Sequence, residues 1–446
     1  MIDEKQFKKI TEIIRGQAGS AGVEVILTDR REGLTRFGNN IVSQHVESRN
    51  AELEIRILDG KKQGKAGCNR FDRETLGRTV ERAAALARVQ KEDPSLLPFP
   101  GPQSYREISH HYSPTAKVLP GHKVDRLKAA IKPVIRTKAR AAGTFTHGEQ
   151  AVGISNSAGL YVFNRYTSAQ FGVTVMAGDG SGWAEATHPD IRTIDPVALT
   201  AAALEKALAS RHPKEFPPGA YDVILEPAAV AELLLFMAWE GFGALQFQEG
   251  RSFLSGKIGK KVFDDRVTIV DDVFDPLTMG LAFDYEGMPR KPVSLIENGI
   301  ARALVFDRKT ARAGKTETTG HSLPQPNTVG PLPLNLSLAG GDSSLDEMVA
   351  GTDKGLLITH FHYTNILDPV SLTITGMTRD GVFRVEKGKV RGPVKNFRFT
   401  ESVVGAFNRI EAIGAERTYA HSFWGGGIIA PAMKIRNFNF SSGTEF

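Results

Sequence analysis

The chain has 446 residues, of which 41% are hydrophobic and 24% are charged, with a net charge of +6 and a single cysteine. This length predicts two or three globular domains, and one cysteine, Cys68, excludes an intramolecular disulfide and a cysteine-rich metal cluster. No run of about 18 apolar residues occurs and the first residues lack the apolar core of a secretion signal, so we expect a cytoplasmic protein without membrane segments.

The positive charge is spread along the chain. The lysines within residues 257–261 and 387–389 have acidic neighbours such as Asp264 and Glu386. Neither a helix-turn-helix, a zinc finger nor an aromatic RNA-binding motif occurs. We therefore expect a solvated charged surface and no nucleic-acid partner. A DNA-associated regulator is the least favoured function, and salt-dependent DNA binding would test it.

The first hundred residues predict a helix, strands and a second helix. Residues 3–17 place apolar side chains at helical spacing behind Asp3, a suitable N-cap. Val23–Thr28 and Ala51–Leu58 predict strands, the second with strict alternation of apolar and charged residues. Asp72 is expected to cap a helix that continues to about Val89.

A proline-rich stretch, residues 92–121, then interrupts regular structure and marks a domain boundary. After it the first arrangement recurs, with helices expected at Val124–Ala142 and Pro196–Ser210 and strands between them. Gly178–Gly182 resembles a hairpin turn more than a phosphate-binding loop. The predicted domains are residues 1–100, 101–216 and 217–446.

Beyond Tyr221 the sequence is typical of short strands separated by turns. Turns are expected at residues 297–299, 380–381 and 386–388, with Ala301–Phe306 as one of the strands. The predicted fold class is α+β: two helix and antiparallel-strand lobes, followed by a mostly antiparallel β domain that contains a buried helix. The absence of strand–helix alternation argues against a parallel nucleotide-binding sheet.

The buried helix is expected to open the third domain. Pro227 suits a first helical turn, and the residues up to Met237 are strong helix formers with almost no polar interruption. Gly241 and Gly243 permit an irregularity at the end of this helix.

Two histidines on one predicted strand, His360 and His362, are candidates for an alternative metal site, because alternate strand residues point to the same face. Asp368 and His421 are conceivable further ligands. Spacing fixes no third ligand, so a polar groove is the other interpretation. The hydrogen-bonding residues that could shape this groove are Asn365, Asp368 and Arg379. Neither a G-x-S-x-G motif nor a cysteine with an obvious histidine partner occurs, so a covalent acyl intermediate has no support.

Nearly the whole chain resembles the TldD/PmbA (TldD/TldE) metalloprotease family, also known as modulators of DNA gyrase. The most specific similarity lies in residues 314–324, 330–336 and 360–381. Residues 239–244 occupy the place of the family's His-Glu-x-x-x-His zinc motif: Glu240 matches, whereas Trp239 and Ala244 replace the two histidines. Trp and Ala offer zinc no ligand atom.

The resemblance implies a subunit of the PmbA/TldE kind, because residues 428–435 also lack the cysteine that completes the family's zinc site. It implies no metal or other cofactor in this chain, a heterodimer with a TldD-like subunit that carries the zinc, and a peptide substrate. We expect a homodimer when the partner is missing. Glu240 matches the position of a general base that acts on metal-bound water, so no catalytic residue is assigned with the metal absent.

The candidate residues for peptide binding, or for the alternative metal, are His321, His360, His362, Asn365 and Asp368. The loops Gly320–Asn335 and His360–Asp368 are expected to line a cavity or to brace the β domain. The alternative function is an independent metal-dependent hydrolase with its site near His360 and His362. Metal analysis and a peptidase assay on the isolated chain would separate the two functions.

Overall fold

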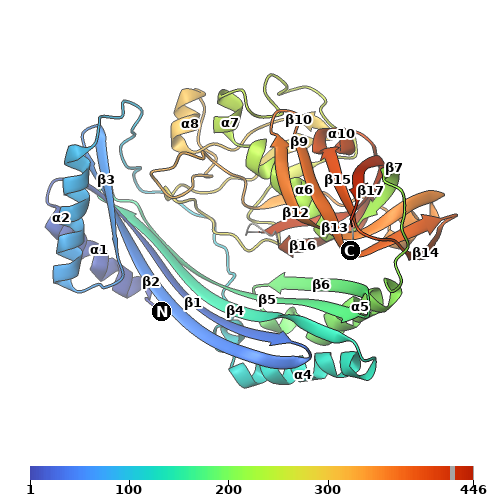
Figure 1. The fold of residues 1–446 in the computed structure, drawn as a ribbon. Helices are drawn as coiled ribbons and strands as arrows, with labels where there is room; N and C mark the ends of the chain where they lie inside the picture. Colours follow the sequence, from blue (N-terminus) through green and yellow to red (C-terminus); the bar gives the residue numbers. More distant parts are fainter. Residues whose placement is uncertain (422–426, 445–446) are drawn as a thin grey trace.

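In the computed structural model, which describes residues 1–421 and 427–444, the N-terminal half forms one six-stranded antiparallel sheet with helices on one face (Figure 1). Its strand order is β3-β2-β1-β4-β5-β6. The helices are α1 (Glu4–Ala18), α2 (Arg73–Val89), α3 (Ser113–Ala116), α4 (Pro120–Arg136), the 3-10 turn η1 (Ile191–Thr193) and α5 (Pro196–Ala209). The strands are β1 (Gly22–Gly38), β2 (Ile41–Asp59), β3 (Lys62–Cys68), β4 (Arg140–Asn156), β5 (Tyr161–Ala177) and β6 (Gly180–His188).

The two predicted N-terminal lobes share this sheet. Strands β1 and β4 pair along their length, from Glu24 opposite Asn156 to Phe37 opposite Gly143. Each lobe has the order helix, strands, helix that the sequence predicted, with three strands in each. The α+β fold class is confirmed, and the lobes are halves of a single sheet.

Local chemistry explains where the N-terminal helices begin and how they pack. Asp3 caps α1 in a capping box and Asp72 accepts a hydrogen bond from the Thr75 backbone N–H, as predicted. A Cβ at Gly64 on β3 would lie 2.1 Å from the Ala83 carbonyl oxygen of α2, so glycine is what allows this helix to lie directly on the edge strand.

The helix predicted at Val124–Ala142 is displaced toward the N-terminus. It begins at Pro120, where proline suits the first turn, and ends at Arg136. Lys138 has a positive φ of 59°, and from Arg140 onward the backbone pairs with β5. Sheet pairing therefore prevails over helix propensity in residues 140–142.

The C-terminal half is a mostly antiparallel β domain around one buried helix, as predicted. Strands β7, β12, β13, β15 and β17 close a ring, because β17 pairs with both β15 and β7. The helices are α6 (Pro227–Glu240), α7 (Ala244–Gln248), α8 (Arg308–Ala313), α9 (Leu345–Ala350) and α10 (Val403–Phe407). The strands are β7 (Gly219–Leu225), β8 (Ile269–Asp271), β9 (Val293–Glu297), β10 (Ile300–Ala301), β11 (Leu336–Leu338), β12 (Lys354–Asp368), β13 (Thr373–Glu386), β14 (Lys389–Pro393), β15 (Phe397–Ser402), β16 (Ile410–His421) and β17 (Gly427–Gly443).

Two local predictions in this domain are wrong. The predicted strand Ala301–Phe306 ends at Ala301, because Val305 exchanges hydrogen bonds with Phe242 and Ala244 between α6 and α7. The turn predicted at residues 380–381 lies inside β13, where Asp380 and Gly381 both have positive φ and the register with β12 shifts nearby. These glycine and aspartate signals mark an irregular strand rather than a hairpin.

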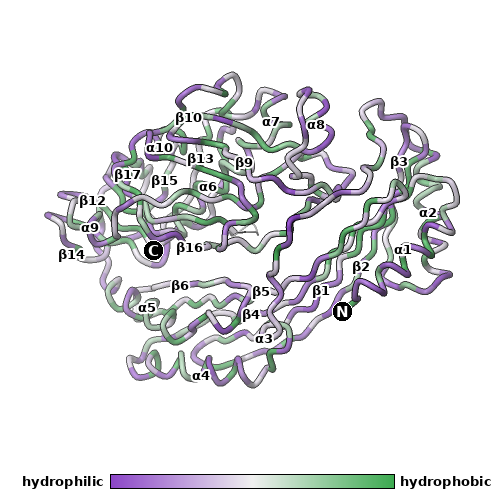
Figure 2. The backbone as a smooth tube through the Cα atoms, turned by 180° about the vertical axis from the view of Figure 1, so that it is seen from behind, coloured by the Kyte–Doolittle hydropathy of each residue, from purple (hydrophilic) through white to green (hydrophobic). Residues whose placement is uncertain are grey.

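The C-terminal domain lies across one face of the curved sheet, and α1, α2, α4 and α5 lie on the other (Figures 1 and 2). Strand β6 contacts β13 and β16. The proline-rich connector, residues 92–121, links the two halves through the Tyr105 hydroxyl, which donates a hydrogen bond to the Gly287 carbonyl oxygen over 2.7 Å.

Cys68 is half-buried at the end of β3. Among the helices of the described residues, none has both the length and the apolar character needed to cross a bilayer.

Candidate functional site

The segment Trp239–Ala244 lies where α6 ends. The helix stops at Glu240 with Gly241 as its C-cap, and Gly243 is the N-cap of α7, so the predicted irregularity is a complete break between two helices. Trp239 is partly exposed, whereas Ala244 is fully buried. The sequence therefore places these two positions on separate helices.

The loop before β11 packs tightly against this break. Gln246 donates hydrogen bonds to the carbonyl oxygens of Trp239 and Val329, over 3.4 and 3.1 Å. A Cβ at Gly243 would lie 2.6 Å from the Pro331 carbonyl oxygen. This part of the loop braces the helix end.

The residues at the helix break do not fit a zinc ion. Zinc takes nitrogen, sulfur or oxygen ligands, and structural and catalytic sites need three or four of them from protein and water. Trp239 and Ala244 offer no donor, which leaves Glu240 as the possible ligand of the three motif positions.

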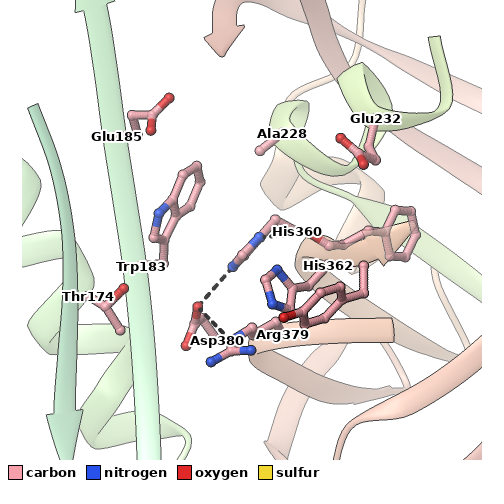
Figure 3. Close-up of a pocket in the computed structure, with 11 residues that line it drawn as sticks. Thr174, Trp183, Glu185, Ala228, Glu232, His360, His362, Arg379 and Asp380 are labelled. Carbon is pink, nitrogen blue, oxygen red and sulfur yellow. Dashed lines mark hydrogen bonds and ion pairs between the residues drawn. The ribbon is translucent and has the colours of Figure 1, made fainter. Parts of the chain in front are cut away.

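A separate pocket of about 460 Å³ lies between the N-terminal sheet and the C-terminal domain (Figure 3). We call it the His360 pocket. The sheet contributes residues of β5 and β6, and the C-terminal domain contributes residues of α6, β12 and β13. The lining residues are Thr174, Trp183, Glu185, Ala228, Glu232, His360, Phe361, His362, Tyr363, Arg379 and Asp380.

His360 is held from three sides. Its Nε2 lies 2.9 Å from an Asp380 carboxylate oxygen and its Nδ1 lies 3.0 Å from the Phe361 carbonyl oxygen. The Trp183 ring stacks on the imidazole, with 4.6 Å between centroids. Both partners are hydrogen-bond acceptors, and a ring nitrogen that donates to either of them has no lone pair left for a metal. This arrangement favours a polar pocket over the alternative metal site.

Burial and charge set the protonation of the pocket. Burial raises the pKa of Glu232, on the inner face of α6, to about 7, with the His360 charge acting in the opposite direction. Burial, together with Arg379 and His360, lowers the pKa of His362. Burial alone would raise the pKa of Asp380, but the hydrogen bond and charge of His360 hold it below its usual range. At neutral pH the pocket therefore combines the neutral imidazole of His362, the Arg379 cation, the Asp380 anion and a Glu232 carboxyl group that titrates.

Replacing Glu232 with glutamine is expected to stabilise the protein at pH 8 by roughly 2–4 kcal/mol, and to have little effect at pH 4. The folded-state pKa is raised, so the stability that the protonated carboxyl provides is fully present below the unfolded value of 4.5 and decreases until the pH passes about 7. Glutamine removes this decrease. Urea unfolding at both pH values measures it.

The matched control for this experiment is Glu205→Gln, since Glu205 is exposed on α5. This change should alter the free energy of unfolding by no more than about 0.5 kcal/mol at either pH. Equal pH dependence of E232Q and the unmodified protein would contradict the prediction.

The other predicted site residues do not gather here. His321 is fully buried, with Nε2 2.8 Å from an Asp271 carboxylate oxygen and Nδ1 2.8 Å from the Thr319 hydroxyl. Asn365 and Asp368 are exposed on β12, outside the pocket, and Asp368 accepts hydrogen bonds from Ser371. Of the predicted candidates whose side chains the structure describes, His360, His362 and Arg379 come together in this pocket. The side chain of His421 lies outside the described part of the structure.

Sequence reasoning missed three principal members of the pocket: Trp183, Glu232 and Asp380. Glu232 had a usable signal, because it is the single charged residue within the apolar run 228–238. Trp183 and Asp380 had none, since Trp183 reaches His360 from β6 and Asp380 reaches it through an irregular part of the neighbouring strand β13. Among residues 1–421 and 427–444, no group of three or more His, Cys, Asp or Glu side chains is arranged to hold a metal ion.

Comparison with known proteins matches all three parts of the chain to one family. Residues 218–442 match the model of the PmbA/TldA metallopeptidase C-terminal domain, residues 114–211 the central domain and residues 23–87 domain 1. The β domain with its buried helix and the preceding sheet are thus the architecture of one class of protein, the metallopeptidases of this three-part type.

Several similarities extend along almost the whole chain. Metalloprotease PmbA of Escherichia coli O157:H7 is 23% identical over 97% of this chain and 95% of its own. The crystal structure of TldE from Thermococcus kodakarensis matches with a TM-score of 0.88 and 21% identity, over 96% of this chain and 99% of that one. A putative modulator of a DNA gyrase from Thermotoga maritima matches equally well, with a TM-score of 0.88, 21% identity, and 97% and 99% coverage.

The chain belongs to the PmbA/TldD metallopeptidase family. It spans only about half the length of several other relatives that it matches.

Proposed function

We propose that this chain is a PmbA/TldE-like subunit, without zinc of its own, of a cytoplasmic heteromeric metallopeptidase that processes or degrades peptides. A TldD-like subunit supplies the zinc and the bond cleavage. This chain pairs with it and helps to hold the peptide, and it forms a homodimer in the absence of the partner. Pairing of two related subunits fits a pseudo-symmetric interface.

The observation that carries the proposal is the helix break at residues 239–244. Family members that use a metal need ligands at the ends of this motif, and here a partly exposed Trp239 and a buried Ala244 occupy both places. The retained Glu240 has no metal-bound water to deprotonate. The fold of the family is retained in full, which supports a role in assembly and binding.

The His360 pocket supports the peptide-binding part of the proposal. It opens between the two halves of the molecule and offers neutral, cationic and anionic groups. Peptides of varied sequence share their backbone N–H and C=O groups, which such a polar pocket can bind without selecting a side chain.

The decisive experiment compares the isolated chain with the same chain co-expressed with a TldD-like subunit. Elemental analysis should find no stoichiometric zinc in the isolated chain and about one zinc ion per heterodimer in the pair. Peptide cleavage should require the pair. Changing the glutamate of the partner's zinc motif to glutamine should abolish cleavage, whereas Glu240→Gln in this chain should leave it unchanged.

Two results would refute the subunit role. One is a stoichiometric metal in the isolated chain together with peptidase activity, which would favour the independent hydrolase. The other is the failure of light scattering and co-purification to detect any complex with the TldD-like chain at micromolar concentration. Histidines introduced at both positions 239 and 244 should not restore activity, because a third ligand is still lacking.

A further inference from the structure

A second pocket, of about 520 Å³, lies between β5 and the loops that precede β9 and β11. We call it the Arg290 pocket. Its walls are largely apolar and aromatic, with Leu281, Phe283 and Leu334 among the lining side chains. Arg290 and Asn335 also line it, and neither belongs to the His360 pocket.

Arg290 is a buried cation that forms no direct ion pair within the described residues. It is only 7% exposed, and its Nη1 has no hydrogen-bond partner in the described structure. Removing a guanidinium from water costs several kcal/mol unless an anion and hydrogen bonds compensate for the lost hydration. An arginine held in this way is prepared for an anion that comes from outside the chain.

The nearby acids are already engaged. The carboxyls that interact with the Arg290 charge include Asp271 and Asp284. Asp271 binds the His321 ring with one oxygen and the Asn335 backbone N–H with the other. Asp284 accepts hydrogen bonds from three backbone N–H groups, those of Glu286, Met288 and Ser322. Neither forms a direct ion pair with Arg290 in the described structure.

Asn335 adds a second donor to the same pocket. Asn335 is only 4% exposed, and its Nδ2 lacks a hydrogen-bond partner in the described structure. The amide fits because residue 280 is glycine: a Cβ there would lie 2.1 Å from the Asn335 side-chain oxygen. Both unpartnered groups are N–H donors, so the complementary ligand is an acceptor.

We propose that the Arg290 pocket binds the free carboxylate of a peptide's C-terminal residue, with the apolar side chain of that residue against Phe283 and Leu334. A carboxylate matches the planar fork of a guanidinium and can accept from an amide at the same time. An apolar side chain on the C-terminal residue of the peptide would pack against the largely apolar walls of the pocket. The assignment of a peptide end rests on the proposed peptidase function; the carboxylate site itself rests on Arg290 and Asn335.

The test uses the isolated full-length chain and two probes that differ in one group, N-acetyl-L-leucine and N-acetyl-L-leucinamide. Titration calorimetry should show binding of the acid and at least about tenfold weaker binding of the amide. Arg290→Met should weaken binding of the acid by about tenfold or more, and Asn335→Ala by a smaller factor. The control Arg312→Met removes an exposed arginine on α8 and should change nothing.

Circular dichroism first establishes that each variant is folded. Asn335→Ala keeps the backbone N–H that donates to Asp271, so this variant provides a second test if Arg290→Met does not fold. Equal affinity for acid and amide would overturn the proposal, as would an affinity that neither Arg290→Met nor Asn335→Ala reduces. Inorganic phosphate that binds as tightly as N-acetyl-L-leucine would also overturn it, since a general anion site needs no apolar wall. No cleavage is measured, so failure of the peptidase pair and failure of this site are distinguishable.

Discussion

Replacing His321 with alanine is expected to reduce the free energy of unfolding by about 3–5 kcal/mol, the usual cost of leaving one member of a buried ion pair unpaired. His321 and Asp271 are both essentially inaccessible to solvent, and Asp271 also holds the Asn335 backbone. Without the imidazole, the carboxylate is left buried without its main counter-charge. Urea unfolding at pH 7 measures the effect.

The control for His321→Ala is His122→Ala, because His122 is exposed on α4; the expected change is within about 0.5 kcal/mol. Burial alone would raise the pKa of Asp271, but His321 holds it below 3.8. The contribution of the pair is therefore present above pH 3.8 and is lost as the pH falls through the lowered pKa. A loss of under about 1 kcal/mol in H321A at pH 7 would contradict the buried-pair interpretation.

Replacing His362 with alanine is expected to reduce peptide cleavage by the reconstituted pair about tenfold or more, without lowering the melting temperature by more than a few degrees. His362 lines the His360 pocket beside Arg379, and its lowered pKa keeps the ring neutral near pH 7, able both to donate and to accept. Alanine removes both capacities. Values of kcat/KM for one peptide substrate measure the change.

Asn365→Ala is the matched control for His362→Ala. Asn365 lies on the same strand but is exposed and outside the pocket, so its removal should leave kcat/KM within about twofold. The sequence predicted both residues as candidates for peptide binding. Comparing the two variants tests whether cleavage depends on a position in the pocket or only on a position in β12. A loss of folding with unchanged specific activity in H362A would indicate a purely structural role.

The sequence predicted those parts of the fold that depend on local signals. Helix α1 begins behind Asp3 and α2 behind Asp72 because side-chain caps act within a few residues. The end of α4 was mispredicted because the competing interaction, pairing of Arg140 with Met176, is distant in sequence. The sequence also did not predict that both lobes share one sheet, because β1 and β4 are separated by more than a hundred residues.

The same distinction explains the candidate site. His360 and His362 were predictable because residues two apart on a strand share a face. Their partner Asp380 was interpreted as a turn residue because aspartate before glycine usually marks one, and only the irregular register of β12 with β13 places it against His360. Trp183 comes from the other half of the molecule, and no local pattern could assign it to the pocket.

The pairing of β1 with β4 determines which part of this protein can fold alone. Because the two strands are paired from Glu24 to Phe37, cutting the chain in the proline-rich connector would leave two fragments that remain joined through backbone hydrogen bonds. Removing either fragment would leave β1 or β4 as a long unpaired edge strand, which can pair with other chains and cause aggregation. The domain 1 and central-domain segments therefore make a single cooperative unit, and shortened versions of this protein are best designed to keep residues 1–216 intact.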